Sequence, residues 1–378
     1  MTDLEFATHH RRILHQHPEL SMQEFKTTEH IIDFLKQMDI PFERPLKTGA
    51  VAFLKGNSGR TVAYRADIDA LPIHEENDVP YRSTVDGVMH ACGHDGHTTA
   101  LMLFAKRCKV LADEGKLAHN VIFMFQPSEE TAAGASQLID AWQPEMDIEA
   151  VFGVHMMPNE DEGKVVLRDD EITASATEFR FHINGASAHV VAKHEGVSSI
   201  ETLLHIATQL TQLQHFHLNG LNRNIIHIGN LNAGEAINTV ASRGYLEGTI
   251  RTYEMSDLDT IKSRMSTLAR TATELFGSEV EVTFNEGYPP VMNVQALRRP
   301  VETALSSLEL DVVENDKPYL FGEDFSFYSR LAPSYFVFFG SRNEEKGFTS
   351  SLHTPAFDLD EKVLMDVADY YEALMNEI

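Results

Sequence analysis

The sequence contains only two cysteines, Cys92 and Cys108, among its 378 residues. Two thiols cannot build the disulfide framework on which small secreted domains depend. Basic residues are also scarce, because 31 Lys and Arg stand against 57 Asp and Glu, which gives a formal net charge of −26. A surface of that sign repels the phosphates of nucleic acid, so we do not expect a nucleic-acid partner.

Long apolar runs are missing as well. The sequence has no apolar stretch of the roughly 18 residues needed to span a bilayer, and its start has neither the basic cluster nor the apolar segment of a secretory signal. We therefore expect no membrane partner and a cytoplasmic location. Histidine, in contrast, is abundant with 19 residues, which directs attention to a histidine-rich site.

Apolar patterning predicts an α/β domain at both ends of the chain. The segments 121–125, 150–154 and 335–339 are apolar at consecutive positions, as strands buried on both faces are. A helical pattern occupies 98–111, and a capping-box pattern predicts that another helix begins at Ser21.

The middle of the chain has a different pattern. Alternating strands and amphipathic helices follow one another there in the order β-α-β-β-α-β, with boundaries at about 177–183, 197–217, 224–231, 243–253, 256–276 and 279–284. This order is the ferredoxin-like split motif. We therefore expect an α+β domain at 172–286, inserted into an α/β domain formed by 1–171 and 287–378.

The densest group of chemically active residues is the segment His-Ala-Cys-Gly-His-Asp-Gly-His at 90–97. A thiolate combined with imidazoles suits zinc or a neighbouring divalent transition metal. The alternative is a buried cysteine surrounded by surface histidines without a ligand role.

Further potential ligands follow the apolar segments. Glu129 and Glu130 come after 121–125, His155 follows 150–154 directly, and His353 lies in the loop after 335–339. Sites in open α/β sheets form beyond the carboxyl ends of strands, so these side chains could converge. Adjacent side chains point in different directions, so one glutamate could bind a metal while the other acts as a general base. A solvated acidic turn is the alternative.

Five segments occur in a characteristic order, namely 65–72, 90–97, 126–130 with Gly134-Ala135, 153–155 and 352–353. Together they resemble the motifs of the metal-dependent amidohydrolases, the family of aminoacylase, hippurate hydrolase, indole-acetyl-amino-acid hydrolase and N-acetyldiaminopimelate deacetylase. The resemblance extends from about Arg11 to the C-terminus. It implies a zinc-peptidase-like α/β catalytic domain in which the inserted domain serves as lid and dimerisation domain.

The resemblance also implies a site for two divalent metal ions per subunit, Mn²⁺, Zn²⁺ or Co²⁺. Glu129 would be the general base, and Asp67, Asp69 and Asp95 would orient the ligands from a second layer. The implied metal ligands are Cys92 as the bridge, His94 and His155 on one ion, and Glu130 and His353 on the other.

His189 in the inserted domain matches the position at which the family places a histidine that reaches the active site of the neighbouring subunit. This match implies a homodimer through the inserted domain. The usual proline before the next histidine, His194, is replaced here by Lys193.

Three further residues resemble substrate-binding positions. Asn238 and Arg251 would contact the substrate carboxylate, and Glu323 would be a polar residue of the pocket. Without the resemblance, Arg251 could equally be a surface cation paired with a neighbouring acid. Asp324 is expected only to cap the helix that follows it.

We therefore expect an enzyme that hydrolyses the amide bond of small N-acyl amino acids, foremost N-acetyl ones, as an aminoacylase or deacetylase does. A dipeptidase or carboxypeptidase of the same family is an alternative. Two other classes are a thiol hydrolase, with Cys92 as nucleophile and His94 or His155 as base, and a metal-binding protein without catalysis. The crowding of ligands around Cys92 disfavours the former, and the presence of Glu129 disfavours the latter.

Overall fold

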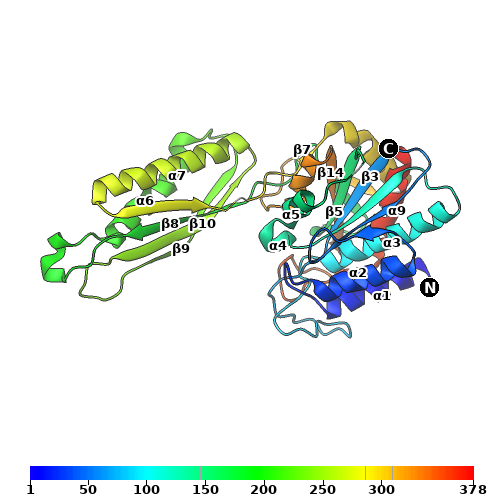
Figure 1. The fold of residues 1–378 in the computed structure, drawn as a ribbon, viewed down its shortest axis with the longest axis horizontal. Helices are drawn as coiled ribbons and strands as arrows, with labels where there is room; N and C mark the ends of the chain where they lie inside the picture. Colours follow the sequence, from blue (N-terminus) through cyan, green and yellow to red (C-terminus); the bar gives the residue numbers. More distant parts are fainter. Residues whose placement is uncertain (145, 286, 309) are drawn as a thin grey trace. The chain divides into compact units, whose positions relative to one another are not determined.

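The computed structural model describes every residue except 145, 286 and 309, and its chain divides into two compact units (Figure 1). The first unit contains Met1–Ile172, Met292–Lys317 and Asp324–Ile378, and the second contains Thr173–Val291 and Pro318–Glu323. The boundary expected at 286 lies outside the described residues. The segment 318–323, which the sequence placed in the first domain, joins the second unit because the N–H of Ala174 donates to the carbonyl of Phe321.

The first unit is built on a mixed sheet with the order β1-β2-β4-β3-β5-β14-β6-β13. Its strands are β1 (Phe42–Glu43), β2 (Ala50–Leu54), β3 (Thr61–Asp67), β4 (Asn120–Gln126), β5 (Ala150–Asp161), β6 (Lys164–Leu167), β13 (Asp311–Glu314) and β14 (Ser334–Arg342). A two-stranded sheet pairs β7 (Asp170–Glu171) with β12 (Met292–Asn293). Because β3, β4, β5 and β14 run parallel, their carboxyl ends point toward the same edge of the sheet.

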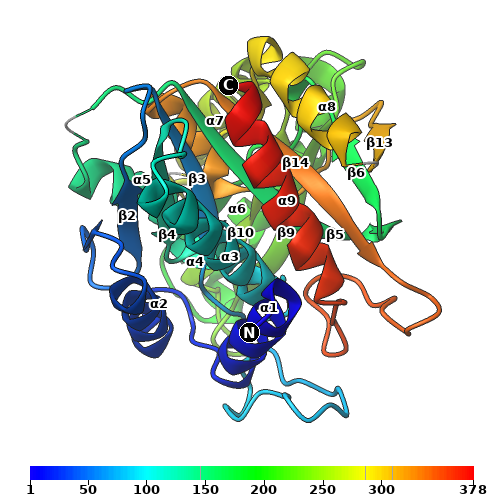
Figure 2. The ribbon, with the colours of Figure 1, turned by 90° about the vertical axis from the view of Figure 1, so that its right-hand side faces the viewer.

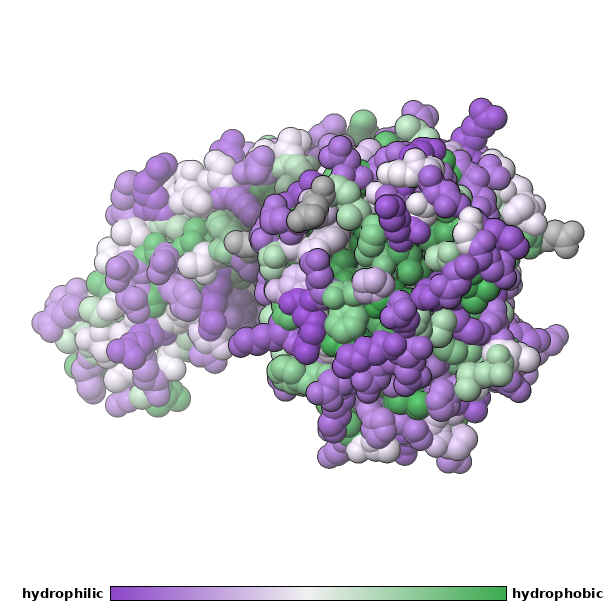
Figure 3. Space-filling model, turned by 45° about the vertical axis from the view of Figure 1, so that its right-hand side comes forward, coloured by the Kyte–Doolittle hydropathy of each residue, from purple (hydrophilic) through white to green (hydrophobic). Residues whose placement is uncertain are grey.

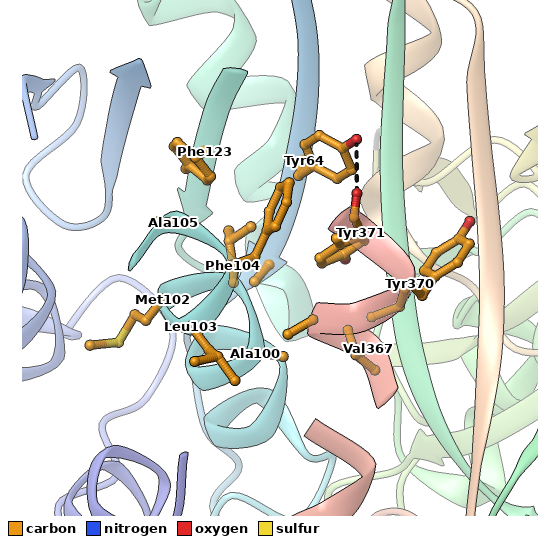
Figure 4. Close-up of a cluster of buried hydrophobic side chains, with 14 of the residues drawn as sticks. Tyr64, Ala100, Met102, Leu103, Phe104, Ala105, Phe123, Val367, Tyr370 and Tyr371 are labelled. Atoms are coloured by element: carbon orange, nitrogen blue, oxygen red, sulfur yellow. Dashed lines mark hydrogen bonds between the residues drawn. The ribbon is translucent and has the colours of Figure 1, made fainter. Parts of the chain in front are cut away.

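Helices cover this sheet, and α3 and α9 lie side by side against it (Figure 2). Phe104 of α3 packs on Tyr64 of β3 and Tyr371 of α9, with ring centroids 4.7 and 5.5 Å away (Figure 4). This buried aromatic cluster fixes α3, whose first residue is His94. The helices of the unit are α1 (Asp3–Gln16), α2 (Phe25–Gln37), α3 (His94–Asp113), α4 (Glu129–Ala132), α5 (Gly134–Ala141), α8 (Arg298–Ser307) and α9 (Lys362–Glu377), with 3-10 turns η2 (Gln295–Leu297) and η3 (Asp324–Arg330).

The buried strands at 121–125 and 335–339 and the helix at 98–111 are confirmed. The predicted capping box at Ser21 is wrong, because α2 begins at Phe25 and the Ser21 hydroxyl instead donates to Asp69 at 2.6 Å. The segment 150–154 also continues further than expected. β5 runs on to Asp161 along β14, although its pairing with β3 ends at Gly153.

The second unit has the predicted β-α-β-β-α-β order, which is confirmed by an antiparallel sheet arranged β11-β8-β10-β9. Its helices pack on one face of this sheet through apolar side chains such as Leu203, Leu210 and Ile261. The elements are β8 (Thr177–Asn184), the 3-10 turn η1 (Val190–Glu195), α6 (Ser199–His217), β9 (Asn224–Ala233), β10 (Arg243–Thr252), α7 (Met255–Phe276) and β11 (Glu279–Phe284).

Hydrophilic residues cover much of the molecular face shown in Figure 3, in keeping with the net charge of −26. Among the described residues, no helix combines the length and apolar character needed to cross a membrane. The cytoplasmic location stays a prediction.

Candidate metal centre

The turn before α3 positions the first two candidate ligands. Cys92 and His94 flank Gly93, which has a φ of +87° and is the N-cap of α3. Glycine adopts this left-handed conformation without the steric cost that a side chain would bring. The chain can therefore turn into α3 between the two ligands, and both side chains are buried.

The candidate ligands meet at Cys92. Its Sγ lies 3.3 Å from Nε2 of His155 and 3.3 Å from Nε2 of His353. Oε1 of Glu130 lies 3.3 Å from Nε2 of His353 and 3.9 Å from Nε2 of His94. The structure thus brings together the five residues that the resemblance implies as ligands, although 261 positions separate Cys92 from His353.

The ligand atoms form two groups that share the Cys92 thiol, one with His94 and His155 and the other with Glu130 and His353. Within each group the atoms lie within 4.8 Å of one another. Within the described part of the chain, the buried Nε2 of His94 has no hydrogen-bond partner. A buried polar atom of this kind points to a ligand. The sulfur, nitrogen and oxygen donors fit two divalent transition-metal ions.

Hydrogen bonds from outside the centre orient the histidines. The Nδ1–H of His94 donates to the Asp69 carbonyl at 2.9 Å, and Nδ1–H of His155 donates to the Met156 carbonyl at 2.7 Å, so both Nε2 atoms are left for the centre. Both ring nitrogens of His97 form hydrogen bonds. Nδ1 donates to the Asp67 carboxylate at 2.6 Å, and Nε2 accepts the N–H of Met156 at 2.9 Å. We therefore interpret His97 as a support for β5 rather than a ligand.

The centre contains an excess of buried negative charge. Burial alone would lower the pKa of His94, but Asp67, Asp69 and Glu130 raise that pKa to about 10. Burial, together with Glu130 and Glu129, raises the pKa of Cys92 well above its usual value. A thiol nucleophile needs a lowered pKa, so this environment argues against a thiol hydrolase. It favours bound cations, which supply the missing positive charge.

Asp95 does not orient a ligand as expected. Its carboxylate accepts from Nε of Arg11 and from Nδ1 of His15, each at 2.8 Å. Burial lowers the pKa of His15, but the Asp95 and Glu75 carboxylates raise it to about 9, so the imidazole is charged at neutral pH. These contacts fasten α1 to the start of α3.

Asp324 does more than the capping expected of it. Its buried carboxylate accepts from Nη2 of Arg65 at 2.7 Å and from Nε2 of Gln126 at 2.8 Å. Arg65 also donates to Asp67 at 2.7 Å. No role was predicted from the sequence for Arg65 or Gln126, although each is a polar residue in a strand whose other residues are mostly apolar.

Glu129 is buried beside this network, and the N–H of Asp324 donates to its Oε1 at 3.5 Å. Glu323 is buried as well, at the end of the segment that belongs to the second unit. The environment of Glu129 suits a base, because a carboxylate shielded from bulk water can take a proton from a bound water molecule.

The remaining candidates lie on the second unit. His189 and Asn238 are exposed neighbours, because the N–H of Val190 donates to the Asn238 carbonyl at 3.0 Å. Arg251 of β10 is half-buried, and among the described residues no carboxylate forms a hydrogen bond with its guanidinium. Burial lowers the pKa of Arg251, while the nearby Glu178 carboxylate raises it, and the role of Arg251 stays a prediction.

Similarity to known proteins identifies the chain as a hydrolase and gives its family. Residues 63–377 match peptidase family M20/M25/M40, and the chain belongs to this family. It is 59% identical over 376 residues to an uncharacterized hydrolase of Staphylococcus saprophyticus, covering 99% of this chain and 98% of that protein. The predicted family and fold class are thereby confirmed.

Two solved structures resemble the chain over almost its whole length. Bacillus subtilis YxeP, described as a dinuclear metal-binding peptidase from the M20 family, has 31% identity and a TM-score of 0.83, with coverage of 99% of this chain and 97% of YxeP. A provisionally named aminohydrolase from methicillin-resistant Staphylococcus aureus has 28% identity and a TM-score of 0.92, with the same coverages.

We predict that the adjacent glutamates have separable roles. Glu129→Gln should retain the metals but lose about 100-fold to 10,000-fold in rate, because an amide of the same size cannot accept a proton. Glu130→Gln should lower metal content, since it removes an anionic ligand oxygen. Metal analysis of both purified variants checks this, and equal metal loss in the two would contradict the assignment.

Proposed function

We propose that this protein is a dinuclear metal-dependent amidohydrolase that cleaves N-acyl amino acids, foremost N-acetyl ones. The main supporting observation is the pair of ligand groups that share Cys92, with Glu129 buried beside them. The name of the relative YxeP as a dinuclear metal-binding peptidase supports the metal count. Mn²⁺, Zn²⁺ and Co²⁺ all suit the donor set.

Divalent ions in this site would polarise the amide carbonyl and make water more acidic. The chain itself supplies the proton transfers. Glu129 takes a proton from the attacking water and delivers it to the leaving nitrogen, while Asp69 holds the ligand His94 and Asp67 holds the supporting His97. His189 of a second subunit donates a hydrogen bond to the oxyanion that develops on the carbonyl.

Arg251 is the proposed partner of the substrate carboxylate, with Asn238 and Glu323 as further polar contacts. In a chain with a net charge of −26, a half-buried cation without a bonded carboxylate is a distinctive anion site. Gly322 leaves space for it, because a Cβ at that position would lie only 3.1 Å from Nη1 of Arg251. A dipeptidase is the second candidate, because YxeP is described as a peptidase.

We also propose a homodimer formed through the second unit. β9 is an edge strand, and Leu231 on it is 43% exposed. The adjacent helix α6 exposes Ile200 and Leu204 by 44% and 60%. An open strand edge beside exposed apolar side chains is a pairing surface, and antiparallel pairing of β9 with β9 of a second copy satisfies twofold symmetry.

A hydrolysis screen tests the reaction class. The protein loaded with Mn²⁺, Zn²⁺ or Co²⁺ should release amino acid from N-acetyl amino acids faster than from dipeptides. Chelation with EDTA should abolish this activity, and added metal should restore it. Activity that survives complete metal removal would contradict the proposal, and faster cleavage of dipeptides would favour the second candidate.

The role of Arg251 is tested with matched substrates. Arg251→Ala should impair hydrolysis of N-acetyl amino acids by roughly 10-fold to 100-fold, the loss of a charge-assisted hydrogen-bond pair. The corresponding amino-acid amides lack the carboxylate charge and should be affected much less. Equal losses for both substrates would show that Arg251 acts only structurally.

Subunit mixing tests the shared site. His189→Ala and Glu129→Gln should each be nearly inactive alone. A freely exchanging equal mixture contains about half hybrid dimers with one intact site each, so activity should recover to about a quarter of wild type. The hybrid dimer can be purified through two different tags. If it is fully metal-loaded yet inactive, His189 does not act in the active site of the partner subunit.

A further inference from the structure

The turn that contains Glu129 and Glu130 has a backbone that needs support from its surroundings. Ser128 before α4 and Ala133 after it have φ values of +59° and +49°, in the left-handed region that non-glycine residues rarely adopt. The turn also closes tightly, because the N–H of Gly134 donates to the Ser128 carbonyl at 2.9 Å and a Cβ at Gly134 would lie 1.7 Å from the Pro127 oxygen. Such conformations persist only where neighbouring groups fix them.

Carboxylates from three distant segments bind three backbone N–H groups of this turn. Oε1 of Glu24 accepts the N–H of Ser128 at 2.9 Å. Oδ2 of Asp324 accepts the N–H of Ala135 at 2.9 Å, at the start of α5. Asp69, already expected to orient ligands, accepts the N–H of Glu130 at 3.0 Å. The turn is therefore held at its beginning, middle and end.

We propose that Glu24 and Asp324 are positioning residues that hold the two ends of the turn and thereby place the carboxylates of Glu129 and Glu130. Neither residue belongs to the two ligand groups that share Cys92. Asp324 adds a second contact, because its own N–H donates to Oε1 of Glu129. The inference rests on the roles proposed above for the two glutamates.

Glu24 is the better residue for a test, because a single oxygen of its side chain makes the contacts. Oε1 accepts the N–H of Met22 as well as that of Ser128, each at 2.9 Å. Asp324, in contrast, is ion-paired with the buried Arg65, so its replacement would disturb folding. Glutamine has the same length and retains the Oε1 acceptor that both N–H groups use.

The experiment compares Glu24→Gln, Glu24→Asp and Glu24→Met with Glu29→Met, which removes an exposed glutamate from α2, the helix that Glu24 precedes as its N-cap residue. The readouts are kcat and KM for N-acetyl amino acids well below the melting temperature, and Mn²⁺ content after dialysis. Glu24→Gln keeps the accepting oxygen and should behave like wild type. Glu24→Asp and Glu24→Met should lose on the order of 10-fold to 100-fold in kcat, with KM little changed, because the reacting carboxylate is displaced.

The Mn²⁺ content of Glu24→Asp and Glu24→Met should fall as well, because Glu130 moves with the turn. If these two variants match Glu29→Met in both kcat and Mn²⁺ content, the inference is overturned, even if their melting temperatures are lower. Glu24→Asp preserves the charge and most of the volume, so the test survives if Glu24→Met does not fold. Mn²⁺ content needs no substrate, which separates failure of this inference from failure of the proposed activity.

Discussion

Concentrated negative charge at the carboxyl edge of the central sheet is the constraint on which the first unit depends. Strand β3 ends at Asp67 and is followed by Asp69, and strand β4 is followed by Glu129 and Glu130. Because these strands are parallel, the four carboxylates lie at the same edge of the sheet. Burial makes their repulsion costly unless positive charge lies close by. Arg65 provides part of that charge through its ion pairs with Asp67 and Asp324.

Cations bound by the ligand atoms around Cys92 would balance the remaining buried negative charge. Burial and nearby carboxylates raise the pKa of Cys92, and carboxylates raise the pKa of His94 against the effect of burial, so without cations both groups hold their protons strongly. Bound divalent ions compete with those protons for the same atoms, and metal affinity should therefore decrease as the pH falls. The supporting hydrogen bonds are directed away from the centre, which leaves sulfur, nitrogen and oxygen donors facing one another.

Much of the fold could be predicted because its causes are local. The apolar segments predicted β4 and β14, and alternating patterns predicted the strand and helix order of the second unit. The failures involve partners distant in sequence. Ser21 bonds Asp69 instead of capping α2, and the bond from Arg65 to Asp324 was not expected. A local pattern shows that such a residue can cap, but it does not show which distant group competes for it.

The candidate site was predictable to a similar degree. The ligand types and the Glu-Glu pair are visible in the sequence, and the family resemblance supplied their grouping around Cys92. Burial of His15 could not be read from its position in an amphipathic helix, because the Asp95 and Glu75 partners come from other segments. The supporting role of Glu24 could not be predicted for the same reason, because its partner Ser128 lies 104 positions away.

The central claim is that two cations share the Cys92 thiol. Anomalous X-ray diffraction from crystals soaked in Mn²⁺, recorded above and below the manganese absorption edge, tests it most directly. The account predicts two anomalous peaks on either side of Cys92 Sγ, one among His94 and His155 and the other among Glu130 and His353. A single peak, or two peaks that leave Cys92 outside both coordination spheres, would contradict it.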